Sequence, residues 1–154
     1  MFLRTIDVRL INFFRKISVG VARFGIFVVF FWFGLLKVVG LSPAGPLVEA
    51  LFNNTIGTVT TSLPFTTFYL GFGVFECVIG ILFAIRGFER VVIPLLLLHM
   101  FTTAIPLFIL AQTTWDGFMV PTLEGQYIIK NLLIIAAAIT VAAHLDPLPQ
   151  SKKR

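Results

Sequence analysis

Charge is scarce in this sequence: Asp, Glu, Lys and Arg make up 12% of its 154 residues. Soluble globular proteins contain about 25% of these residues. Hydrophobic residues reach 58% of the chain, and 18 of them are phenylalanine. This composition excludes an ordinary soluble domain and predicts a membrane protein.

Cysteine is also scarce: Cys77 is the only cysteine, and no Cys-x-x-Cys motif occurs. One cysteine excludes an internal disulfide, and the missing motif argues against a metal or redox dithiol site. Cys77 falls in an apolar segment, where a cysteine more often packs as a small hydrophobe than reacts as a thiol. We therefore expect no metal site.

Four apolar windows approach the ~20 residues that a helix needs to cross the hydrocarbon core. They cover residues 21–41, 65–85, 91–111 and 125–144. A transmembrane barrel would need short alternating segments, and these windows do not alternate. The sequence therefore predicts an all-α fold, a four-helix transmembrane bundle, with one domain over residues 20–146.

Positive charge is absent from two predicted loops, residues 42–64 and 112–124. Ten of the twelve Lys and Arg residues lie at or beyond the opposite helix ends: Arg4, Arg9, Arg15, Lys16, Arg23, Arg86, Arg90, Lys152, Lys153 and Arg154. By the positive-inside rule, these ends and both termini face the cytoplasm. Topology and the lipid bilayer thus explain the net charge of +5, and no nucleic-acid partner is expected.

The two ends of the chain lie outside the predicted spans. Residues 1–19 place apolar side chains at helical spacing with basic residues mostly elsewhere, which predicts an amphipathic helix on the cytoplasmic face. A simple anchor for the first span explains this helix more readily than a lipid sensor does. Residues 147–154 form a basic cytoplasmic tail.

Each predicted span holds one ionisable group deep in an apolar segment: Lys37, Glu76, His99 and Lys130. With a rise of ~1.5 Å per residue, Lys37 and Lys130 lie about 6 and 8 Å below the outer helix ends. Glu76 and His99 lie about 15 and 18 Å below them. Charged groups at such depth usually face protein or a water-filled cavity and mark functional sites.

These four residues are the candidate ligand-binding set. Two lysines against one glutamate leave a positive charge in excess, which would attract an anionic or electron-rich ligand. In the alternative, Lys37 or Lys130 pairs with Glu76 and the other lysine extends to the outer interface. Gly34, Gly73 and Gly80 share helix faces with Lys37 and Glu76, so we expect close helix contacts there.

Three motifs resemble one known family when taken in order: Phe33-Gly34-Leu35-Leu36-Lys37, Gly73-x-x-Glu76-x-x-x-Gly80, and Glu124-Gly-Gln-Tyr-Ile-Ile-Lys130. Together they are similar to the reactive chlorine resistance membrane protein family of the DoxX-like superfamily. The resemblance extends from Arg23 to Asp146, and Asn131 departs from it because the family commonly has an aspartate there. The first outer loop also looks shorter than in many relatives, which weakens any transfer of ligand or partner contacts from them.

The resemblance implies an inner-membrane protein of the oxidative and reactive-chlorine stress response, in a superfamily linked to quinone or thiol redox systems. Our first hypothesis is that an outer-half pocket lined by Lys37, Glu76 and Lys130 binds a quinone or a small anionic ligand. The alternative is a non-catalytic anchor or assembly subunit for a membrane or periplasmic redox partner. A small transporter is less favoured, because four spans leave little room for alternating access. Two questions stay open at this point: whether the protein catalyses a reaction, and whether it forms a homo-oligomer.

Overall fold

The structure is a computed structural model that describes residues 2–60 and 62–148. Within this part of the chain, four helices are long and apolar enough to cross a membrane: Arg4–Val38, Phe65–Ala84, Glu89–Ile109 and Leu123–Ala143. These helices coincide with the four predicted windows, so the all-α transmembrane bundle is confirmed. Most of the predicted basic tail, from residue 149 on, lies outside the described residues.

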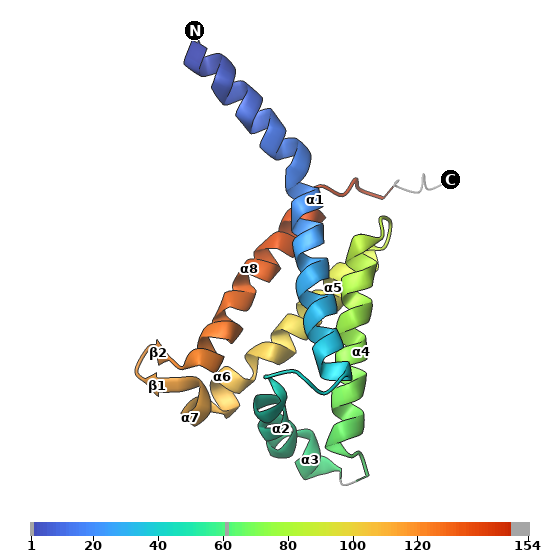
Figure 1. Cartoon of the computed structure of the whole chain (residues 1–154), viewed down its shortest axis with the longest axis vertical. Helices are drawn as coiled ribbons and strands as arrows, with labels where there is room; N and C mark the ends of the chain where they lie inside the picture. The colour runs from blue at the N-terminus through green and yellow to red at the C-terminus, as the bar shows by residue number, and fades with distance from the viewer. Residues whose placement is uncertain (1, 61, 149–154) are drawn as a thin grey trace, which may run out of the picture.

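Helix α1 (Phe2–Val38) joins the expected amphipathic helix and the first span into one helix of 37 residues. Its N-terminal part projects away from the other helices and carries exposed apolar side chains such as Leu10, Phe13 and Phe14 (Figure 1). An exposed apolar stripe beside basic residues is typical of a helix at a membrane interface.

Helix α1 stops at a Schellman motif. The Leu41 N–H donates to the Leu36 carbonyl at 2.8 Å, and the Gly40 N–H donates to the Lys37 carbonyl at 3.2 Å. Gly40 has a φ of 74°, which an L side chain rarely adopts. This ending places Lys37 in the last turn of the helix.

Helices α1 and α4 (Phe65–Ala84) approach each other closely along their length. A Cβ atom added to Gly34 would lie 2.7 Å from the Gly73 carbonyl oxygen, and one added to Gly80 would lie 2.8 Å from the Phe31 backbone nitrogen. Such distances leave no room for a side chain. The glycines therefore permit a backbone-to-backbone contact, as small residues commonly do in membrane helices.

The connections from α1 to α4 and from α5 (Glu89–Ala104) to α8 (Leu123–Ala143) form small elements at one end of the bundle. Helices α2 (Gly45–Asn54) and α3 (Ile56–Val59) link α1 to α4. Helices α6 (Pro106–Ile109) and α7 (Ala111–Thr114) then lead into the antiparallel hairpin of β1 (Trp115–Gly117) and β2 (Val120–Pro121). Figure 1 shows all of these elements at the same end of the molecule.

Helices α5 and α8 complete the bundle. The buried core comprises Ile26, Phe30, Ile79, Phe83, Val92, Ile93, Leu96, Met100, Ala138 and Val141. The α8 residues in this core lie in its C-terminal half. Toward the end with the hairpin, α8 diverges from α1 (Figure 1).

Candidate functional site

Three ionisable side chains from three helices meet inside the bundle. Lys37 of α1 donates from Nζ to Oε2 of Glu76 on α4 at 2.6 Å. His99 of α5 places Nε2 3.2 Å from the other carboxylate oxygen, Oε1. The three residues are 7%, 6% and 3% exposed. One buried carboxylate thus bridges a lysine and a histidine.

Local sequence explains why Lys37 and Glu76 meet. Gly73 precedes Glu76 by three residues and Gly34 precedes Lys37 by three, so each glycine lies on the face of its charged neighbour. A Cβ atom on Gly73 would lie 2.8 Å from the Lys37 Cβ atom. The missing side chain is therefore what lets the Lys37 stem pass over α4.

Aromatic rings enclose the histidine. The ring centroids of Phe30, Phe72 and Phe75 lie 5.4, 5.1 and 5.8 Å from that of His99. The Lys37 ammonium lies 5.6 Å from the Phe72 centroid, which is within cation–π range. Because these rings keep water away, the electrostatic interactions among the three polar groups are stronger than in solvent.

For a neutral His99 ring, the contact with Glu76 decides which nitrogen carries the proton. An ionised Glu76 carboxylate accepts hydrogen bonds only, so a neutral His99 beside it carries its proton on Nε2. Its Nδ1 atom is then an acceptor. This atom is buried and has no hydrogen-bond partner among the described residues. A buried polar atom without a partner costs about 1–3 kcal/mol, so it is a good place to expect a ligand.

Lys130 does not join this cluster. Its side chain is exposed, and Nζ lies 5.4 Å from the ring centroid of Tyr127, one turn earlier on α8. Lys130 and the buried Val141 are eleven residues apart and share a helix face. Lys130 therefore stays outside the cluster because α8 diverges from α1, and not because its side chain lies on the wrong face of α8 (Figure 1).

The depths expected from residue counting do not match the observed grouping either. Lys37, in the last turn of α1, meets Glu76 and His99, which were expected about 9 and 12 Å deeper. Helix α4 extends past the end of α1 toward α2 and α3 (Figure 1), so the two helix ends are not level. Because Lys130 stays outside, the cluster contains one lysine and one glutamate, without the expected excess of positive charge.

A second buried ion pair was not predicted from the sequence. Arg23 of α1 donates to Glu89 at the start of α5, and each residue is 9% exposed. The Glu89 carboxylate also accepts from the Gly87 N–H at 2.7 Å. A signal is present in the sequence, since Arg23 shares the helix face of Lys37. The positive-inside rule, however, accounts for this arginine without a partner.

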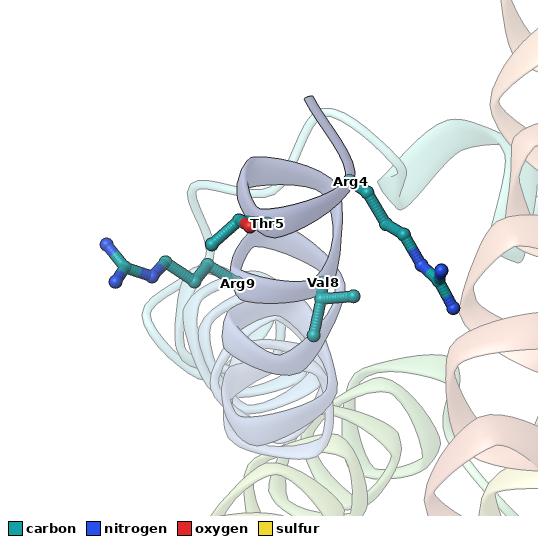
Figure 2. A pocket seen from close by; sticks show the side chains of 4 residues that line it. All are labelled: Arg4, Thr5, Val8 and Arg9. Atoms are coloured by element: carbon teal, nitrogen blue, oxygen red, sulfur yellow. The ribbon is translucent and has the colours of Figure 1, made fainter. Parts of the chain in front are cut away.

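Two hollows on the described part of the chain lie away from the cluster. One, of about 430 Å³, is lined by Arg4, Thr5, Val8 and Arg9 on the first turns of α1. Figure 2 shows Arg4 and Arg9 pointing to different sides of this single helix, so they do not converge on one ligand. The other hollow, of about 280 Å³, lies beside Arg23 and Glu89.

Comparisons with known proteins add no relative: no family model matches the chain, and neither a curated protein nor a solved structure does. The resemblance to the reactive chlorine resistance family stays a prediction.

Proposed function

We propose that this membrane protein acts in the oxidative and reactive-chlorine stress response of the bacterial inner membrane. In this role it binds a quinone head group beside Lys37, Glu76 and His99. The observation that carries the proposal is the His99 Nδ1 atom, which is buried and has no hydrogen-bond partner among the described residues. A ligand that donates a hydrogen bond there would remove the cost of leaving it unpaired.

A quinone in its reduced form suits this environment. Its head group is a flat ring with hydroxyl groups, and one hydroxyl can donate to His99 Nδ1 while the ring packs against Phe72 or Phe75. A small anion suits it less. Lys37 is already neutralised by Glu76, and Lys130 is exposed elsewhere on α8.

A quinone ring needs space beside His99, and the neighbouring side chains must move to provide it. Neither of the two hollows described above reaches His99. Phe72 and Phe75 are half-buried and lie beside His99, so a rotamer change at either opens a path from the lipid. Quinones partition into lipid, which makes this the natural direction of approach.

The orientation we propose follows the charges. Arg23 and Arg86 lie at the end of the bundle away from the hairpin, and the loops at the hairpin end contain no Lys or Arg. The positive-inside rule places the first end in the cytoplasm. Lys37, in the last turn of α1, then lies toward the periplasm.

Quinone content tests the binding directly. We expect protein purified in mild detergent to retain quinone, detected by solvent extraction and chromatography, and His99→Leu to lose most of it. His144→Leu is the matched control, because His144 is exposed at the end of α8. Equal quinone content in His99→Leu and the unchanged protein, at equal abundance, would contradict the binding site.

Cell survival tests the stress role. We expect Lys37→Ala to reduce survival in hypochlorite and Lys130→Ala to leave it unchanged, since Lys37 pairs with Glu76 and Lys130 is exposed elsewhere. Protein abundance in the membrane must be matched by immunoblot. Normal survival of cells with Lys37→Ala would reject the proposed role.

A second candidate function, an anchor for a redox partner, is supported by the hairpin. Phe118 and Met119 at its tip are 96% and 74% exposed. Trp115 is not part of this exposed tip, because its Nε1 donates to the Leu107 carbonyl at 3.0 Å. A stoichiometric partner that is lost with Phe118→Ser but kept with Lys37→Ala would favour this function over quinone binding.

A further inference from the structure

The hollow of about 280 Å³ lies where three segments converge. Helix α1 contributes Lys16, Gly20 and Arg23 to its lining. The connection from α4 to α5 contributes Arg86, and α5 contributes its first residue, Glu89. The end of α8 contributes Val141 and His144. Ligand pockets commonly measure ~300–1,000 Å³, so this hollow suits a small group. Its walls come from distant parts of the sequence and are held by the buried core around Val141.

Positive charge dominates the lining. Lys16, Arg23 and Arg86 face a single carboxylate, that of Glu89. This carboxylate already accepts from Arg23 and from the Gly87 N–H. It therefore cannot neutralise the other two cations, and the hollow attracts an anion.

Arg23 provides the second observation. The residue is 9% exposed, and its Nη2 atom is buried without a hydrogen-bond partner among the described residues. Nη1 is engaged by Glu89. A guanidinium presents a planar set of donors that matches phosphate oxygens, so the unused Nη2 is a ready donor for a phosphate group.

The position of the hollow indicates which phosphate is available. Helix α4 ends at Ala84, α5 begins at Glu89 and α8 ends at Ala143. Three membrane-spanning segments thus end at this level, where the head groups of lipids lie. Lys16 and Arg86 are exposed and line the hollow, so both side chains are available to a head group.

We propose that this hollow is a phosphate-binding site that holds the phosphodiester of an anionic lipid. Arg23 Nη2 contacts the phosphate from inside, and Lys16 and Arg86 contact it from the rim. Free inorganic phosphate shares the same chemistry and is the other source. The site is separate from the His99 cluster and does not depend on quinone binding.

Native mass spectrometry of the detergent-purified full chain tests the site. The probes are short-chain phosphatidylglycerol, short-chain phosphatidylcholine and inorganic phosphate. We expect one tightly bound phosphatidylglycerol, and binding of phosphatidylcholine at least about tenfold weaker because its choline cation meets Lys16 and Arg86. If inorganic phosphate binds with the same sensitivity to the variants below and phosphatidylglycerol does not, the phosphate site stands and its occupant is the free ion.

Two double variants distinguish a specific binding site from general electrostatic attraction of the lipid. Lys16→Gln with Arg86→Gln removes two rim charges and should weaken phosphatidylglycerol binding about tenfold or more, while Arg23 stays paired with Glu89. Arg9→Gln with Arg15→Gln also removes two exposed charges of α1 but none from the hollow, and should leave binding unchanged. The proposal would be overturned if both double variants bound phosphatidylglycerol as tightly as the unchanged protein, or if both lost this binding to the same extent. Quinone content should be normal in both, so this test and that of the proposed function can fail separately.

Discussion

Arg23 and Lys37 lie on one face of α1, fourteen residues or about 21 Å apart, and each donates to a glutamate on a neighbouring helix. Their surroundings differ. The Lys37–Glu76 pair is enclosed by His99 and phenylalanine rings, whereas the Arg23–Glu89 pair borders a hollow at a helix end. Under our two proposals, an uncharged ring binds at the enclosed pair and an anion binds at the open one.

The two pairs should also contribute differently to stability. In an enclosed site, a charge that loses its partner has no water to replace it. Beside a hollow, water or an ion can take the partner's place. Two variants, Glu76→Ala and Glu89→Ala, measure this difference, and Gly34→Ala and Lys130→Ala test the surroundings of the enclosed pair. For each we compare the free energy of unfolding in mixed micelles with that of the unchanged protein.

Glu76→Ala should have the largest effect, a loss of about 3–5 kcal/mol, because it leaves Lys37 buried without a counter-charge. Titration with SDS, followed by circular dichroism, measures the change. The control is the double variant Lys37→Met with Glu76→Leu, which removes both charges and should recover part of the loss, since His99 Nε2 still lacks its partner. A single variant as stable as the unchanged protein would mean that water reaches Lys37.

Gly34→Ala should cost about 2–3 kcal/mol, in the upper part of the range for overpacking, since the new Cβ atom would lie 2.7 Å from a backbone oxygen of α4. The same SDS titration applies. Gly71→Ala is the control, because nothing lies within 4 Å of an added Cβ atom there. The close contact between α1 and α4 would be refuted if both alanine variants behaved alike.

Glu89→Ala should cost about 1–2 kcal/mol, less than Glu76→Ala, because Arg23 keeps access to the hollow. Thermal unfolding in buffers with and without phosphate gives a second readout, and added phosphate should reduce the loss. If Glu89→Ala proved as damaging as Glu76→Ala and insensitive to phosphate, the proposed difference between the two pairs would be wrong.

Lys130→Ala should change stability by less than about 0.5 kcal/mol, as expected for an exposed side chain. Its effect is therefore the smallest of the four and contrasts with that of Lys37. Light scattering of the same sample reports the oligomeric state. A loss above about 1 kcal/mol, together with a dimer mass, would instead place Lys130 in an interface between two copies.

The candidate site was only partly predictable. Lys37, Glu76 and His99 were recognised because an ionisable group in an apolar helix is conspicuous by itself. The sequence could not show that Lys130 stays outside, because its helix face is suitable and only the divergence of α8 removes it. The phenylalanines around His99 were hidden for a different reason: among 18 phenylalanines, no local pattern distinguishes those that face a histidine from those that face lipid.

The sequence alone determined the four spans, the all-α fold and the faces on which the buried charges and glycines lie. These properties depend on composition and on the helical repeat, which act over a few turns of one segment. The tertiary structure decided which charges meet, because the tilts and end levels of the helices set the distances between segments. For this reason Lys37 and Arg23, on one helix face, belong to two sites of different character.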